Sequence, residues 1–316
     1  MGRRLAKLIG PIERILWDRS PVVLMYHRVA PTADDLWGIA VEADRFAEQI
    51  EALKRVREVV PLDEVLAWMD HGRGGSRPLA AVTFDDGYHD ALTTALPILE
   101  KLDCPATVYV ATGPVQNGRP FWWDELARIF RTAAEPAGPL RLTIGKRHIA
   151  WTLPSDRRGR ELACRQVRRR LRGLEPAAIE AQLEIIGVWA GAPQGPDPED
   201  RAMTPDEVGR LSQGLVTVGA HTVHHPSLPS LSPEAQLAEI AGSRQACEAW
   251  TGKKVEHFAY PFGHYSRAGV KAVHEAGFRS SCATTPGVVR PWTDPLRLPR
   301  ITPGRMDGEA LSRLLA

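Results

Sequence analysis

The chain has 316 residues, 43% of them hydrophobic and 25% charged, a composition that is typical of globular proteins and excludes disorder over most of the chain. Its 40 basic and 38 acidic residues give a net charge of +2, which argues against a dedicated nucleic-acid-binding protein. The first segment, residues 1–20, lacks the uninterrupted apolar stretch of a signal peptide, and the sequence contains no transmembrane span. We therefore expect a cytoplasmic protein.

The same N-terminal segment, residues 1–20, has apolar residues that recur at the spacing of an amphipathic helix, with basic residues between them. We consider two interpretations. The segment packs against the fold, or it docks weakly on an anionic membrane surface at the inner face of the membrane.

Strands and helices alternate along most of the remaining chain. The predicted strands are 22–26, 79–84, 106–111, 215–220, 257–260, 278–283 and 296–301, and the predicted helices are 42–55, 63–69, 89–102, 233–251, 266–276 and 308–316. Apolar strands that alternate with helices predict parallel βαβ units, and seven or eight strands favour a barrel over a small open sheet. In such an α/β barrel, the chemistry gathers at the carboxyl ends of the strands.

Residues 115–202 break this alternation and are too many for a simple loop. They contain an aromatic stretch with Trp122 and Trp123, a predicted hairpin over 140–153 with Gly145 near its turn, two helical stretches and a Gly/Pro-rich loop over 191–198. We expect an inserted lid or subdomain beside the mouth of a single barrel domain, residues 21–316. The two tryptophans suit either stacking on a sugar or the core of the insertion itself.

The four cysteines, Cys104, Cys164, Cys247 and Cys282, are widely spaced and form no C-x-x-C pair. This spacing argues against a zinc site made of thiolates. We expect buried, reduced side chains.

The strongest local signal is the sequence from Thr83 to Tyr88, in which a buried strand runs directly into Asp85 and Asp86 and then Gly87. Two adjacent carboxylates repel each other unless a cation or a proton lies between them. Gly87 permits a sharp turn, so both side chains could enter one pocket. The alternative is that Asp86 caps the following helix.

A second signal follows another predicted strand, where His221 and His225 lie four residues apart. This spacing can direct two imidazoles to one point, and neutral imidazole is a common ligand of zinc-like metals. The neighbouring His224 is interpreted as structural.

Asp86, His221 and His225 together predict a site for one divalent metal, with Asp85 free beside it. Two histidines and one carboxylate leave positions open for water and substrate, which is typical of a catalytic site. A metal-bound water of lowered pKa beside a free carboxylate predicts a hydrolase that acts on an amide or ester.

These motifs resemble those of the polysaccharide deacetylases, carbohydrate esterase family four. T-F-D-D-G at residues 83–87 matches the first family motif, H-T-x-x-H at 221–225 the second, and 259–263 the third, R-x-P-Y-G, in a degenerate form. The resemblance covers roughly 22–102 and 203–302. It implies a distorted (β/α)7 barrel that removes acetyl groups from amino sugars.

The resemblance also implies roles for single residues. Asp85 would be the catalytic base, and Asp86, His221 and His225 would bind a metal that is commonly zinc, with cobalt or nickel tolerated. The backbone N–H of Phe262, in the third motif, would help to hold the oxyanion. Tyr88, which follows the first motif, is a candidate substrate contact with Trp122 and Trp123.

Two positions depart from the family pattern. The arginine of the third motif is Ala259 here, and we expect Arg300 to supply the missing charge or to be structural. No histidine follows His274, so the usual C-terminal acid is absent. The sequence around His27 resembles the permuted branch that includes poly-N-acetylglucosamine deacetylases, which makes His27 either the candidate acid or a structural residue.

Eight arginines lie between Arg157 and Arg172, and they form either a solvated helix face or a surface that attracts phosphate or an anionic membrane. The sequence as a whole predicts a metal-dependent enzyme that removes N-acetyl groups from a glycan or glycoconjugate. The alternatives are a de-O-acetylase or cyclic-amide hydrolase on the same scaffold, and a non-catalytic carbohydrate-binding protein.

Overall fold

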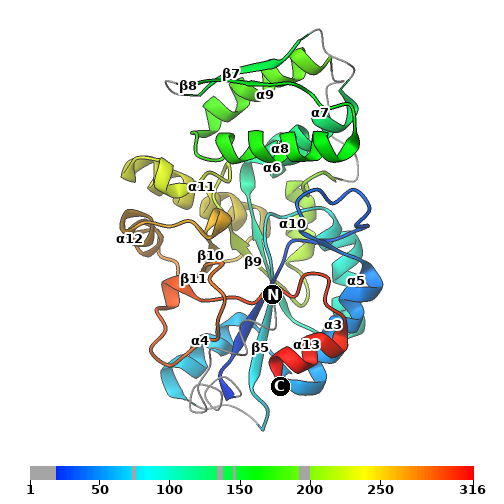
Figure 1. Ribbon diagram of the computed structural model, residues 1–316. Coiled ribbons are helices and arrows are strands. Elements are labelled where there is room, and N and C mark those ends of the chain that lie inside the picture. The colour runs from blue at the N-terminus through cyan, green and yellow to red at the C-terminus, as the bar shows by residue number, and fades with distance from the viewer. Residues whose placement is uncertain (1–18, 73–75, 134–137, 145–146, 192–199) are drawn as a thin grey trace.

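The computed structural model describes residues 19–72, 76–133, 138–144, 147–191 and 200–316. A curled parallel sheet surrounded by helices forms the main body, and a second group of elements lies at one end of it (Figure 1). The strands of the sheet are β1 (Val22–Tyr26), β4 (Glu58–Val59), β5 (Leu79–Phe84), β6 (Ala106–Val110), β9 (Val216–Ala220), β10 (His257–Ala259) and β11 (Ser280–Cys282). Their order is β1-β5-β6-β9-β10-β11, with β4 paired to β5.

The helices of the main body lie around this sheet. They are α3 (Ala43–Val56), α4 (Leu62–His71), α5 (Leu96–Lys101), α10 (Pro205–Leu211), α11 (Pro233–Thr251), α12 (Arg267–Glu275) and α13 (Gly308–Leu315). A small sheet of β2 (Arg28–Val29) and β3 (Ala40–Val41) extends from β1.

A short segment after β11 joins the two edges of the sheet. Leu298 pairs in parallel with Cys282 of β11, and Ile301 pairs in parallel with Leu24 of β1. The backbone of Ile301 donates to Val23 and accepts from Met25, at 2.8 and 2.9 Å. This segment completes a ring of seven strand positions, so the predicted distorted α/β barrel is confirmed.

The apolar runs of the sequence became the strands of the barrel. Every residue of β1, β5 and β6 is buried, as expected for parallel strands covered on both faces. On the outside, α3 buries Phe46, Ile50 and Leu53, which lie on one helical face, next to α13. Each such side chain contributes about 1.5–3 kcal/mol relative to an exposed one. All four cysteines are buried and free, as predicted.

Two predicted elements differ from the structure because of proline. The predicted helix 89–102 begins as a π-helical turn, Ala91–Ala95, before α5. Pro97 has no N–H to donate to the preceding turn, which loosens the helix there. The predicted strand 296–301 begins as a 3-10 turn, Pro295–Arg297, and only Leu298 and Ile301 pair with strands.

The segment between β6 and β9 forms the second group of elements (Figure 1). It contains α6 (Thr112–Asn117), α7 (Trp122–Thr132), the antiparallel strands β7 (Leu140–Ile144) and β8 (Arg147–Trp151), α8 (Arg157–Leu171) and α9 (Pro176–Ala190). Its apolar side chains from Leu126 to Ala190 form a hydrophobic cluster separate from that of the barrel. The predicted hairpin is β7 and β8; its turn, with Gly145, and residues 192–198 of the predicted loop lie outside the described residues.

Among the described residues, no helix has both the length and the apolar character needed to cross a membrane. The predicted amphipathic segment, residues 1–20, lies outside the described residues except for 19 and 20.

Candidate active site

The two predicted motifs lie at the same rim of the barrel. Asp85 and Asp86 follow β5, and His221 follows β9, which is separated from β5 by β6 alone. Because these strands run parallel, their carboxyl ends share one rim. The structure therefore brings the two carboxylates and the two histidines together.

A sharp turn after β5 sets the direction of both carboxylates. Asp86 and Gly87 have positive φ values of 76° and 90°. The turn leaves little room, since a Cβ added to Gly87 would lie 3.1 Å from the side chain of Val110. The left-handed conformation of Asp86 breaks the alternation of the strand, so the side chains of Asp85 and Asp86 both reach the rim.

Three side chains converge there. One ligand atom from each of Asp86, His221 and His225 can be chosen so that all three lie within 4.8 Å of one another, and all three residues are buried. Oδ1 of Asp86 lies 3.5 Å from Nε2 of His221 and 3.2 Å from Nε2 of His225. Nδ1 of His221 is 2.7 Å from the carbonyl of Ala259, which fixes the ring so that its Nε2 faces the site.

The electrostatics of these residues fit a divalent cation. Burial alone would raise the pKa of Asp86, but hydrogen bonds from His221 and His225 hold it well below its usual range, so the carboxylate is ionised. Burial lowers the pKa of His225, which favours neutral imidazole, the form that binds metals. Within the described residues, Nδ1 of His225 is buried without a hydrogen-bond partner. The donor set of two imidazoles and one carboxylate is that of catalytic zinc sites.

Asp85 is held by Arg300. The two guanidinium nitrogens of Arg300 donate to the two carboxylate oxygens at 2.7 Å each, and Nε donates to the carbonyl of Ala283 at 2.9 Å. Burial raises the pKa of Asp85, but the charges of Arg300 and His221 outweigh it and lower the pKa below its ordinary value. Asp85 is therefore an ionised carboxylate beside the proposed metal ligands and not one of them.

Comparisons with known proteins show the family of the chain. The family model for polysaccharide deacetylase matches residues 72–135 and 167–281, which together exceed half of the chain and include the four residues Asp85, Asp86, His221 and His225. The chain belongs to the polysaccharide deacetylase family. His27 and Arg300 lie outside the matched residues.

Individual relatives are distant. The putative polysaccharide deacetylase YxkH of Bacillus subtilis (strain 168) is 26% identical over 85 residues, which are 27% of this chain and only 30% of that protein. Among solved structures, the Streptococcus pyogenes deacetylase PplD in complex with acetate has a TM-score of 0.62 at 18% identity, over 94% of this chain and 98% of that chain. IcaB from Ammonifex degensii has a TM-score of 0.59 at 19% identity, with the same coverage. At these identities the two structures show the fold alone.

His27 follows β1, which pairs in parallel with β5 so that Tyr26 lies opposite Phe84. The next residue on each strand is then His27 on one side and Asp85 on the other, and the N–H of Asp85 donates to the carbonyl of Tyr26 at 3.0 Å. His27 is half-buried, and its charge contributes to the lowered pKa values of Asp85 and Asp86. The structure thus places His27 at the same rim as the proposed metal ligands.

Phe262 lies in the 3-10 turn Pro261–Gly263, which follows β10, the neighbour of β9 in the sheet. Its φ is 57°, a left-handed conformation that is rare for an aromatic residue. Its ring centroid is 4.6 Å from that of His225. The degenerate third motif therefore borders the site, and Ala259, which replaces its arginine, contributes a carbonyl to His221.

The aromatic candidates differ in their exposure. Tyr88 is completely buried, and its hydroxyl accepts from the indole of Trp123 at 2.8 Å and donates to Asp124 at 2.6 Å. Trp123 is 3% exposed and packs on His225, with ring centroids 4.6 Å apart. Trp122 is half-buried. Tyr88 and Trp123 are thus buried against the proposed metal site. Neither side chain has an exposed face that could contact a sugar, so the predicted role as substrate contact does not fit them.

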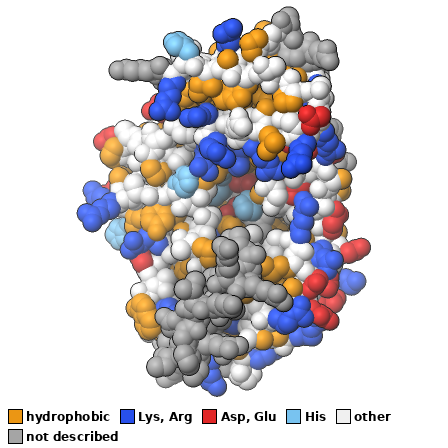
Figure 2. Space-filling view, viewed as in Figure 1, with side chains coloured by type: hydrophobic (Ala, Val, Ile, Leu, Met, Phe, Trp, Pro, Cys, Tyr) orange, Lys and Arg blue, Asp and Glu red, His pale blue; other side chains and the backbone are white. Residues whose placement is uncertain are grey.

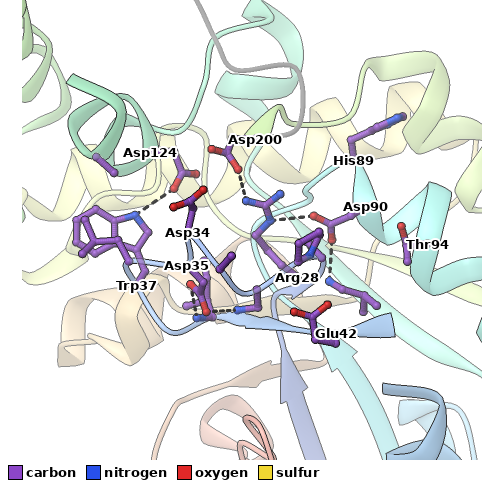
Figure 3. Close-up of a pocket in the computed structure, with 18 of the residues that line it drawn as sticks. Arg28, Asp34, Asp35, Trp37, Glu42, His89, Asp90, Thr94, Asp124 and Asp200 are labelled. Carbon is purple, nitrogen blue, oxygen red and sulfur yellow. Dashed lines mark hydrogen bonds and ion pairs between the residues drawn. The ribbon is translucent and has the colours of Figure 1, made fainter. Parts of the chain in front are cut away.

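Asp124, which belongs to none of the predicted motifs, joins three parts of the molecule. It lies on α7, accepts from Tyr88 of the barrel, and also accepts from the indole of Trp37 at 3.1 Å. Asp124 lines a cavity of about 740 Å³, together with Arg28 and Asp200 (Figure 3). Burial raises the pKa of Asp124 to about 7. The only signal in the sequence was an acid at the end of an aromatic run.

Proposed function

We propose that the protein is a metal-dependent hydrolase that removes N-acetyl groups from an amino-sugar-containing glycan or glycoconjugate. The observation that carries the proposal is the ionised, unliganded Asp85 next to the cluster of Asp86, His221 and His225. A non-catalytic carbohydrate-binding protein would not need a buried acid held by its own arginine.

Asp86, His221 and His225 would hold the metal. A bound divalent ion, zinc in our proposal with cobalt or nickel as alternatives, would supply a Lewis acid for the acetyl carbonyl and a water of lowered pKa. Residues of the chain carry out the proton transfers and bind the oxyanion.

Asp85 accepts the proton of the attacking water, and Arg300 keeps this carboxylate ionised and fixed in place through two parallel hydrogen bonds. The Phe262 N–H donates to the oxyanion as it forms at the carbonyl oxygen. His27 gives a proton to the amine nitrogen as the C–N bond breaks, which avoids expulsion of an amide anion.

The test is acetate release from chito-oligosaccharides and from lipid-linked and nucleotide-linked N-acetyl sugars, with and without a chelator. We expect release of acetate with a free amine on the product, loss of activity on chelation, and recovery when zinc is added back. A product with a new hydroxyl group would indicate a de-O-acetylase, and a ring-opened product would indicate a cyclic-amide hydrolase. Acetate release that a chelator does not affect would contradict the metal-dependent mechanism.

A further inference from the structure

Arg168 of α8 and Arg172, the residue at the end of this helix, face the proposed active site from the second group of elements. Arg168 and Arg172 are four residues apart and therefore share a helical face. Their guanidinium carbons lie 5.9 and 5.4 Å from the ring centroid of Phe262, and that of Arg168 lies 4.5 Å from the ring of Trp37. Because Phe262 packs on His225, one aromatic ring separates each guanidinium from a proposed metal ligand.

These two charges have no anionic partner in the described part of the chain. Neither forms an ion pair or a side-chain hydrogen bond there, and Nε of Arg168 is buried without a partner. In contrast, the exposed Arg157 at the start of the same helix pairs with Glu161 and Asp34. Burial and the nearby charge of Arg172 both lower the pKa of Arg168. The charges of Asp86 and Asp124 raise the pKa of Arg168 but offset this effect only in part. Two neighbouring, partly buried positive charges without a direct ion-pair partner are unfavourable, and binding of an anion would relieve this cost.

The surface near the second group of elements also carries many positive charges. Figure 2 shows Lys and Arg side chains gathered where the second group of elements meets the barrel, around a hollow in which acidic and His side chains are visible. A ligand that enters this hollow from the face shown passes positively charged side chains.

We propose that Arg168 and Arg172 bind a phosphate group of the substrate, so that the sugar deacetylated here is a phosphorylated or phosphate-linked amino sugar. This inference rests on the proposed function. Two guanidiniums match the two negative charges of a phosphate monoester or a sugar-linked diphosphate, whereas a carboxylate would neutralise only one. The planar fork of each arginine suits phosphate oxygens, and the aromatic rings of Phe262 and Trp37 hold the forks in place.

Binding can be tested without turnover, because glucose 1-phosphate and glucose 6-phosphate have no acetamide to cleave. Calorimetric titration of the metal-loaded wild type should show that at least one of them binds tenfold or more tightly than glucose. Arg168→Gln and Arg172→Gln should each weaken that binding by about tenfold or more, since a charge-assisted hydrogen bond is lost. The matched control, Arg170→Gln, removes an exposed charge from the same helix and should bind like the wild type.

Each of the following results would overturn the phosphate site: equal binding of glucose and of both phosphates, equal losses in Arg170→Gln and Arg172→Gln, or tighter binding of glucuronate than of either phosphate. Undiminished phosphate binding in both Arg168→Gln and Arg172→Gln would mean that the metal alone holds the anion, and it would also overturn the proposal.

Activity then separates this inference from the proposed function. Acetate release should be compared for N-acetylglucosamine, its 1- and 6-phosphates, and nucleotide-linked and lipid-linked forms. We expect KM for the preferred phosphorylated sugar to rise roughly tenfold in Arg172→Gln and to stay at the wild-type value in Arg170→Gln. No acetate from any of these, with arginine-dependent phosphate binding intact, would contradict the proposed function and leave the phosphate site standing. Acetate release without preference for phosphate would contradict the phosphate site alone.

Discussion

At the scale of single residues, the proposed metal site depends on three side chains. We expect Asp86→Ala, His221→Ala and His225→Ala each to lower metal affinity and activity together, by at least about 100-fold. Residues that only orient a metal ligand contribute about 10–100-fold, and a ligand contributes more. Metal content after dialysis, measured beside acetate release, checks this expectation.

His224→Ala is the matched control for these variants. His224 is exposed and lies next to His225, but its Nδ1 is 2.6 Å from Glu239, away from the cluster. Glu239 also accepts from the backbone of Val223 and His224, and the substitution leaves these hydrogen bonds in place. The control should keep its metal, whereas stoichiometric metal in His225→Ala would refute the ligand assignment.

Asp85 can be separated from the metal ligands. Asp85→Asn should retain the metal but lose turnover by a factor on the order of 10²–10⁴, because a general base is removed and no ligand is lost. The substitution also leaves Arg300 without its counter-charge, so urea unfolding must be measured to confirm that the variant is folded at the assay temperature. Turnover close to that of the wild type would rule out the role of base.

The proposed role of His27 predicts a dependence on the leaving group, because a proton donor speeds the reaction only when the leaving group is poor. His27→Ala should keep the metal and slow the hydrolysis of amides more than that of activated esters, whose leaving groups need no proton. Rates on an acetylated amino sugar and on an activated acetate ester, measured on the same preparation, provide the comparison. Equal losses on the two substrates would mean that His27 is not the acid.

The sequence identified Asp85, His221 and His27 because each follows a strand. Asp85, His221 and His27 come directly after buried apolar runs, and parallel strands in one barrel bring such positions to one rim. The position of Arg168 could not be predicted in this way. A run of arginines indicates a helix with a charged surface, but it does not indicate which of the arginines face the site. The orientation of Arg168 depends on how α8 packs within the inserted segment, and that packing involves residues far away in the sequence.

At the scale of the elements, the turn after β5 sets the geometry of both carboxylates. Gly87→Ala should destabilise this turn and lower metal affinity, because φ is 90° and the new Cβ would meet Val110 at 3.1 Å. We expect a loss of about 1–3 kcal/mol in stability. Unfolding in urea and metal titration of the same variant measure the two effects.

Gly118→Ala is the control for backbone strain. Gly118 also has a positive φ, of 63°, but nothing lies within 4 Å of its added Cβ. It ends α6 at a distance along the chain from both motifs. This variant should lose stability while its metal affinity stays unchanged. If both glycine variants bind metal like the wild type, the turn does not position Asp86.

The predicted elements were correct where one physical signal dominated. Continuous apolar runs identified β1, β5 and β6, and helical periodicity with a final glycine identified α11. The predictions failed where a proline removed one backbone donor. Pro97 changes a helix into a π-helical turn followed by α5, and the resulting register depends on the barrel beneath it.

At the scale of the whole molecule, barrel closure and site assembly depend on the same short segment. The strand position that joins β11 to β1 contains Arg300, whose backbone donates to Thr285 and whose side chain binds Asp85. The ion pair therefore connects the carboxyl end of β5 to the closing segment on the other side of β1. Loss of Arg300 would affect both the position of the base and the closure of the ring.

The inserted segment is joined to the barrel by a buried acid, and this makes a prediction about pH. Asp124 of α7 accepts from Tyr88 of the barrel, and burial raises its pKa from 3.8 to about 7. Below about pH 4 the group is protonated in both the folded and the unfolded chain. Between about pH 4 and 7 the unfolded chain loses this proton and the folded chain keeps it, so the free energy of unfolding falls as pH rises.

We therefore expect Asp124→Asn, which cannot ionise, to gain stability relative to the wild type as pH rises from about 4 to 7. Over the whole interval, a pKa difference of this size changes the free energy of unfolding by roughly 4 kcal/mol. Urea unfolding of both proteins at pH 4, 5.5, 7 and 8 measures it. Above pH 7 the difference should level off, because Asp124 is ionised in both states. A stability difference that does not change with pH would mean that Asp124 is already ionised in the folded protein at pH 4, held so by the hydroxyl of Tyr88 and the indole of Trp37.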